Sequence, residues 1–113
     1  MKFSFINPSS NEELRGRIGG EASWPPLGLL YMATILREKG LEVSVLDQPA
    51  KGFSIEDTVR WVERESPDIL GFSGNSMSGR TAALTSIEVR KSIPDLPMVF
   101  GSLYATFNAE RVL

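Results

Sequence analysis

Short apolar runs alternate along the chain with longer segments of helical spacing. Four runs have the residue pattern of strands: Lys2–Ile6, Glu42–Leu46, Asp68–Ser73 and Met98–Phe100. Helical spacing follows in the segments Leu27–Lys39, Ser54–Glu65, about Gly79–Ser92 and, as the opening of a further helix, Asn108–Leu113. This alternation predicts an α/β fold, a three-layer flavodoxin-like (Rossmann-like) sandwich whose parallel sheet has the strand order 2-1-3-4 and no fifth strand.

Turn residues and caps predict where these helices begin and end. Gly40 follows the first helical segment and predicts its C-terminal cap. Ser54 and Asp57 have the spacing of a capping box, which predicts the start of the second helix. The apolar positions of the third helix predict that it turns three side chains toward the sheet: Ala83, Leu84 and Ile87.

Two features predict a ligand or a partner. The loop from Asn7 to Trp24 runs about 18 residues, whereas ordinary links between a strand and a helix take roughly 2–6. The first helix carries apolar residues around almost its whole circumference, so we expect it to meet a second surface besides the sheet. That surface is the rest of a longer chain, a large ligand, or a second subunit in a homodimer.

Composition narrows the classes of partner. The chain has 113 residues, room for one domain, and a net charge of -2 with its basic residues spread from Lys2 to Arg111. This even distribution predicts neither nucleic acid nor an anionic membrane as a partner. No apolar run reaches the roughly 18 residues of a membrane helix, and no signal peptide pattern opens the sequence, so we expect a cytoplasmic location.

Cysteine and histidine are both absent from the sequence. Their absence excludes disulfides, zinc sites of the Cys/His type, an iron–sulfur cluster ligated by these residues, and catalytic dyads or triads built on Cys or His. Any cofactor bound here therefore has to bring its own metal.

Three motifs carry a resemblance to a known family. They are Trp24–Tyr31 (WPPLGLLY), continued by Leu36–Val43 (LREKGLEV) and Asp47; Ser66–Ser73 (SPDILGFS); and Val99–Thr106 (VFGSLYAT). In order and spacing they are similar to the cobalamin (B12)-binding domain that precedes the catalytic domain of B12-dependent radical-SAM proteins. The resemblance covers residues 1–113, which we expect to form that domain, incomplete at its C-terminus.

The resemblance implies cobalamin as the ligand and a site at the carboxyl ends of the strands. Small and hydroxyl residues are expected to receive the nucleotide tail: Ser73, Gly74, Asn75, Ser76, Gly101 and Ser102. The corrin ring would lie across the strand ends, against Asn7, Pro8, Pro26, Leu27, Gly28, Leu103 and Tyr104. No residue is expected to be catalytic or to bind a metal directly.

The family pattern also implies a parent enzyme. Its 4Fe–4S cluster and S-adenosylmethionine would belong to a downstream radical-SAM domain, because the Cys-x3-Cys-x2-Cys motif is absent here. The parent is expected to be a B12-dependent methyltransferase or a related radical enzyme, whereas these 113 residues alone would not be an enzyme. We expect a fragment or a truncated reading frame.

Without histidine, cobalt would have no protein imidazole ligand, which agrees with the radical-SAM branch of the family, where that histidine is commonly missing. The sequence departs from the branch pattern where Gly101-Ser102-Leu103-Tyr104 stands in place of Gly-Gly-Pro-His. This changed loop and the missing fifth strand favour an alternative, a degenerate flavodoxin-like docking or structural domain that binds no cofactor. Asp47 stands where dinucleotide folds place their ribose-binding acid, but no GxGxxG turn accompanies it.

Overall fold

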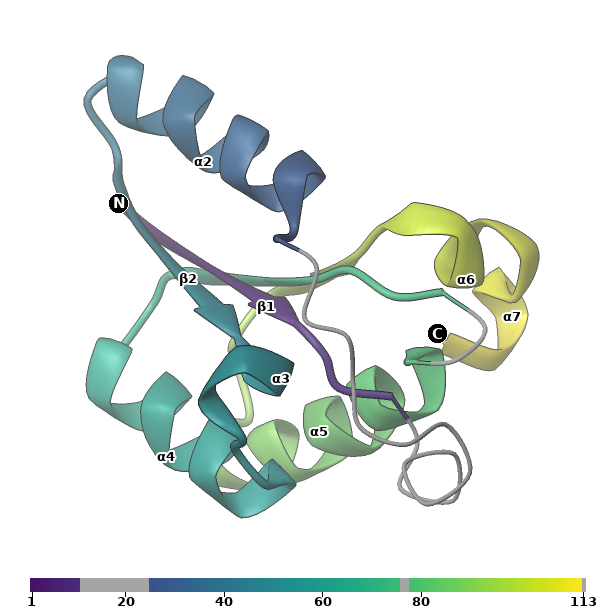
Figure 1. Cartoon of the computed structure of the whole chain (residues 1–113). Helices are drawn as coiled ribbons and strands as arrows, with labels where there is room; N and C mark the ends of the chain where they lie inside the picture. Colours follow the sequence, from purple (N-terminus) through teal and green to yellow (C-terminus); the bar gives the residue numbers. More distant parts are fainter. Residues whose placement is uncertain (11–24, 76–77, 113) are drawn as a thin grey trace.

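A parallel sheet forms the centre of the molecule. The computed structural model describes residues 1–10, 25–75 and 78–112. Its strands are β1 (Lys2–Asn7), β2 (Glu42–Asp47), β3 (Ile69–Phe72) and β4 (Met98–Phe100). They lie in the order β2-β1-β3-β4, and each pair of neighbouring strands is parallel. Figure 1 shows β1 and β2 side by side at the centre of the molecule. The predicted fold class and strand order are therefore confirmed.

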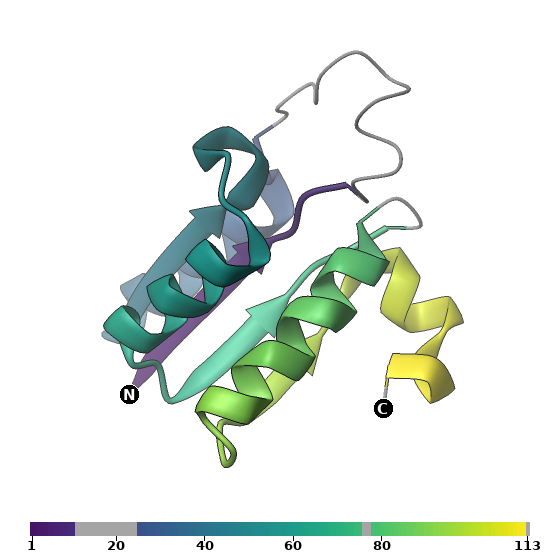
Figure 2. The same ribbon diagram turned by 90° about the horizontal axis from the view of Figure 1, so that it is seen from below.

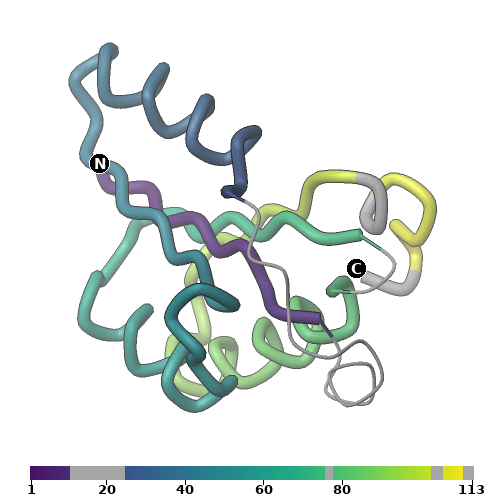
Figure 3. The backbone as a smooth tube through the Cα atoms, in the orientation of Figure 1, coloured from purple at the N-terminus to yellow at the C-terminus, as the bar shows by residue number. Residues whose placement is uncertain are grey.

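Helices cover the two faces of the sheet unequally. On one face lies α2 (Leu27–Glu38), and on the other lie α4 (Ile55–Glu65) and α5 (Gly79–Ser92), side by side as Figure 2 shows. Three shorter helices lie among the described residues, α3 (Gln48–Lys51), α6 (Ser102–Phe107) and α7 (Ala109–Val112). Of these, α3 and α6 were not predicted. Figure 3 shows the course of the backbone. Among the described helices, none is long and apolar enough to cross a membrane.

The main hydrophobic core lies between the sheet and the pair α4 and α5. It consists of residues from the strands, from one face of each helix and from the link before β4: Ile6, Leu46, Leu70 and Phe72; Val62, Ala82 and Val89; and Leu96. On the opposite face of the sheet, Leu29 and Ala33 of α2 are buried as well. Both layers of helices therefore remove apolar sheet surface from water, the main favourable term in folding.

The prediction for the inner face of α5 was wrong. Leu84 and Ile87 are 43% and 53% exposed, while Thr85 is fully buried. The Thr85 hydroxyl donates to the Thr81 carbonyl oxygen at 2.7 Å, so its polar group is satisfied within the helix. Burial of Thr85 with Val89 turns Leu84 and Ile87 outward. The spacing of apolar residues alone therefore predicted the wrong inner face for α5, because Thr85, a polar residue, is one of those that face the core.

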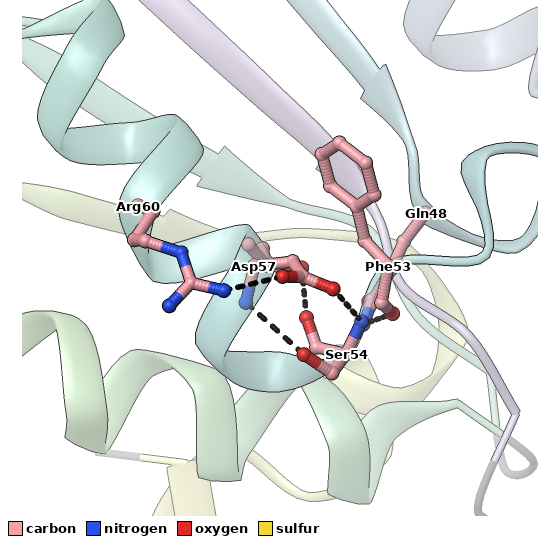
Figure 4. Close-up of polar contacts among 6 residues, drawn as sticks. Gln48, Phe53, Ser54, Asp57 and Arg60 are labelled. Atoms are coloured by element: carbon pink, nitrogen blue, oxygen red, sulfur yellow. Dashed lines mark hydrogen bonds and ion pairs between the residues drawn. The ribbon is translucent and has the colours of Figure 1, made fainter.

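The predicted caps are confirmed. Ser54 Oγ accepts from the Asp57 backbone N–H at 3.1 Å, and an Asp57 carboxylate oxygen accepts from the Ser54 backbone N–H at 3.1 Å (Figure 4). The backbone hydrogen bond from Ser54 and the adjacent Arg60 guanidinium lower the pKa of Asp57. At the end of α2, Gly40 takes a φ of 85°, the left-handed conformation that favours glycine.

Candidate functional site

A groove opens beside α2, over the part of the sheet that this helix leaves uncovered. Its volume is about 440 Å³ and its lining is mainly apolar. Predicted site residues that line it are Asn7, Pro26, Leu27, Gly28, Ser73, Gly101 and Ser102. The structure thus brings residues from β1, the start of α2 and the ends of β3 and β4 to one place.

The floor and one wall of this groove were not predicted from the sequence. These additional lining residues are Phe5, Leu29, Met32, Gly71, Phe72 and Val99. Phe5 pairs in register with Gly71, and Gly71 with Val99, so the three form one row across the sheet. Since alternate residues of a strand point to opposite faces, the alternation within each strand was the signal that could have located this row.

The glycine of the third strand has a packing role at the groove. A Cβ atom on Gly71 would lie 2.6 Å from Phe5 Cδ1 and 2.8 Å from Phe5 Cε1. The aromatic ring therefore lies directly over β3, in space that only glycine leaves free. This close approach explains why a buried strand has a glycine in its centre.

Two other glycines of the groove have no such neighbours. A Cβ atom on Gly28 would meet nothing within 4 Å, and one on Gly101 would reach only the Phe72 carbonyl oxygen, at 4.0 Å. Neither residue has a positive φ. Packing within the described chain thus leaves both positions open to a side chain, although glycine within a helix costs stability relative to alanine.

Ser102 holds a backbone conformation that suits glycine. Its φ is 71°, in the left-handed region, and the residue is exposed. The turn that leads into it is held by the Gly101 backbone N–H, which donates to the Phe72 carbonyl oxygen at 2.9 Å. The backbone at position 102 thus has a conformation that favours glycine, while serine is the residue present.

The loop after β3 is closed by its own hydrogen bonds. The Asn75 backbone N–H donates to Ser78 Oγ at 3.1 Å, and the Ser78 backbone N–H donates to Asn75 Oδ1 at 3.1 Å. A Cβ atom on Gly74 would lie 3.3 Å from the Gly79 Cα atom. Gly74 and Asn75 therefore shape this loop and do not line the groove, and the predicted Ser76 lies outside the described residues.

The remaining predicted residues lie away from the groove lining or are only partly described. Pro8 is buried, and next to it the Ser9 backbone N–H donates to Gln48 Oε1 at 3.1 Å. Gln48 Nε2 donates in turn to the Phe53 carbonyl oxygen at 3.0 Å, which ties the start of the first loop to the turn before α4 (Figure 4). Leu103 and Tyr104 lie within α6. Positions 11–24 of the long first loop are outside the described residues.

Polar side chains from three neighbouring strands meet at the carboxyl edge of the sheet. Asn7 Nδ2 donates to Asp47 Oδ1 at 3.0 Å, and Ser73 Oγ donates to Asn7 Oδ1 at 3.4 Å. Asn7 and Ser73 both line the groove. One end of an apolar groove thus carries a short chain of oriented hydrogen-bonding groups.

Comparison with known proteins assigns the chain to a family. A model of the B12 binding domain matches residues 18–113. The chain belongs to the B12-binding domain family. The resemblance seen in the sequence is confirmed at this level, and the four-stranded fold agrees with it.

Two curated relatives match this B12-binding domain over its whole length. An uncharacterized methyltransferase of Pyrococcus horikoshii is 28% identical over 114 residues, 24% of that protein. The anaerobic magnesium-protoporphyrin IX monomethyl ester cyclase of Synechocystis sp. is 27% identical over 115 residues, 23% of its length. The chain therefore spans about a quarter of the length of these relatives. No solved structure matches it significantly.

Proposed function

We propose that residues 1–113 bind cobalamin and serve as the cobalamin-binding domain of a longer radical-SAM protein. The observation that carries the proposal is the groove with its two unexplained glycines. Gly28 and Gly101 both border it, and a Cβ atom at either position would enter space that no described residue fills. Glycine where the chain itself does not require it is expected where a ligand approaches the backbone closely.

The groove has the right character for one part of cobalamin. A planar aromatic base, such as that of the nucleotide tail, buries its faces favourably against apolar and aromatic side chains. Phe5, Met32 and Val99 offer such surfaces, and Val99 is 59% exposed in the chain alone. The much larger corrin ring would lie outside, across the carboxyl ends of the strands, where ligands of open α/β sheets bind.

The chain's own part would be to hold the cofactor and to exclude water from its tail. Bound cobalamin supplies an organometallic centre whose cobalt–carbon chemistry supports methyl transfer and related radical reactions. Because the sequence has no histidine, the chain has no imidazole to place on cobalt. We propose that the parent is a methyltransferase or a related radical enzyme, with its 4Fe–4S cluster and S-adenosylmethionine in a downstream domain.

The cytoplasmic location of the protein stays a prediction from the sequence.

Reconstitution tests the proposal. The purified chain is incubated with hydroxocobalamin and passed over a gel-filtration column, and the protein peak is read in the visible region. We expect corrinoid absorbance to elute with the protein. A colourless protein peak would overturn cobalamin binding by this chain.

A pair of variants on the same helix sharpens this test. Met32 lines the groove and is 46% exposed, while Ile35 lies one turn later, is 42% exposed and is not part of the lining. Met32→Glu places a charge among apolar groups and should abolish the coloured peak. Ile35→Glu carries the same charge outside the groove and should leave it in place. Equal colour in both variants would locate the site elsewhere.

A second candidate function, docking without a cofactor, is favoured by the outer surface of α2. Outside the groove lining, three of its apolar side chains are between 42% and 75% exposed: Leu30, Tyr31 and Ile35. Exposed apolar groups that lie together are typical of protein interfaces. A dimer detected by light scattering, together with no uptake of hydroxocobalamin, would favour this function over the first.

A further inference from the structure

Asp47 lies beside the groove without lining it, at one end of the hydrogen-bonded chain described above. The chain runs across three adjacent strands, from Asp47 at the end of β2, through Asn7 at the end of β1, to Ser73 directly after β3. The register pairs Asn7 with Asp47, so the contact between their side chains follows from the sheet itself. Only Asn7 and Ser73 reach the groove.

The chemistry of these groups determines the orientation of the Asn7 amide. An ionised carboxylate only accepts hydrogen bonds, so the amide has to turn its Nδ2 toward Asp47. Its oxygen then lies toward Ser73, whose hydroxyl donates to it. Turning the amide the other way would place Asn7 Oδ1 against the Asp47 carboxylate, and neither of these two oxygens would then receive a hydrogen bond from the other residue.

We propose that Asp47 is a positioning residue that presents the Asn7 amide, in one fixed orientation, to the carboxamide groups around the edge of a corrin ring. The inference rests on the proposed function and adds a specificity to it. The Asn7 amide keeps one N–H and one lone pair that are not used in its hydrogen bonds to Asp47 and Ser73. A carboxamide on the corrin ring both accepts and donates hydrogen bonds, so it is complementary to the Asn7 amide. Peripheral carboxamides are what distinguish cobalamin and cobinamide from their acidic precursors.

A carboxylate in the same place would bind worse for two reasons. It has no proton to donate to the Asn7 oxygen, and it brings a negative charge close to that of Asp47. The site should therefore discriminate between corrinoids that carry amides and corrinoids that carry acids. This discrimination is independent of the nucleotide tail, which belongs to the other part of the groove.

Two probes without a nucleotide tail test the specificity. Dicyanocobinamide carries peripheral amides, and dicyanocobyrinic acid carries carboxylates at the corresponding positions. Binding of each is measured by equilibrium dialysis with detection in the visible region. For the unaltered chain we expect cobinamide to bind at least about tenfold more tightly, the equivalent of one net hydrogen bond.

Variants at Asp47 then separate positioning from a general loss of structure. Asp47→Ala should weaken cobinamide about tenfold while strengthening or sparing the acid, because one charge repulsion disappears. Asp47→Asn keeps the side-chain volume but frees the amide of Asn7 to turn, so it should show a smaller loss of the same preference. Glu42→Ala is the matched control, since Glu42 is exposed at the opposite end of the same strand. It should change neither affinity.

The outcomes distinguish this inference from the proposed function. If Asp47→Ala and Asp47→Asn weaken both corrinoids equally, Asp47 has only a structural role and the inference is wrong. Unchanged cobinamide binding in both variants, in a chain that takes up hydroxocobalamin, would also overturn it while leaving the proposed function intact. Failure of the unaltered chain to bind hydroxocobalamin would overturn the proposed function itself.

Discussion

Replacing Gly28 by alanine should have opposite effects on stability and on cobalamin binding. Gly28 is the second residue of α2, and a Cβ atom there would meet nothing within 4 Å. Alanine should therefore stabilise the helix without strain, by about 0.5–1 kcal/mol. For a domain of this size the gain corresponds to a rise in Tm of roughly 2–6 °C, which thermal unfolding followed by circular dichroism would detect.

The same methyl group should weaken the bound state. If the ligand occupies the open space beside Gly28, an added methyl overpacks the site at a cost of about 1–3 kcal/mol. That cost corresponds to a Kd for hydroxocobalamin about five- to 150-fold higher, measurable by titration in the visible region. A structural defect would instead lower stability and affinity together.

A control on the same helix separates the two effects. Thr34 is exposed on α2 and does not line the groove, so Thr34→Ala changes helix propensity and one exposed hydrogen bond, from the Thr34 hydroxyl to the Leu30 carbonyl oxygen. Its Kd should equal that of the unaltered chain. If Gly28→Ala is stabilised yet binds cobalamin as tightly as before, the ligand does not approach the backbone at this position. If it is destabilised, the space there is not open.

Four further changes test the fold at the groove and at the start of α4. Ser102→Gly should raise the free energy of unfolding by about 1 kcal/mol, measured in urea, because φ is 71° there; no gain would contradict the left-handed assignment. Gly71→Ala should cost about 1–3 kcal/mol through its clash with Phe5, and adding Phe5→Leu should recover part of that loss in a double-mutant cycle; additive effects would contradict the contact. Ser54→Ala should cost about 1 kcal/mol by removing the cap of α4. The pKa of Asp57 is lowered in the folded chain, so the stability that its carboxylate contributes should be present above its ordinary pKa near 4 and be lost as the pH falls through the lowered folded pKa. The difference in Tm between the unaltered chain and Asp57→Asn should therefore shrink in acid.

Periodicity was a sound guide to the order of elements and a weaker one to side-chain direction. Strands and the long helices were located because a strand or an amphipathic helix has a period that a short window reveals. The inner face of α5 was predicted wrongly because Thr85 satisfies its hydroxyl within the helix and is buried. The short helices α3 and α6 span four and six residues, too few for a period to be visible.

The site was only partly predictable for a similar reason. Residues at the ends of strands could be located, because parallel strands bring their carboxyl ends to one edge, and Asn7, Ser73 and Gly101 do line the groove. Phe5 and Val99 lie within strands, and whether such residues are covered depends on where a helix lies over the sheet. Gly74 was expected to receive the ligand, yet it packs against the start of α5.

The sequence by itself determined the α/β class, the strand order, the caps of α2 and α4 and the resemblance to B12-binding domains, because these depend on local spacing and on short motifs. Only the tertiary structure decided which face of the sheet remains open beside α2, which glycines have a packing reason, and that Asp47, Asn7 and Ser73 form one chain. The physical reason is that these features join residues far apart in the sequence, 66 positions in the hydrogen bond between Ser73 and Asn7. Such contacts are set by the register of the strands and the placement of the helices on them.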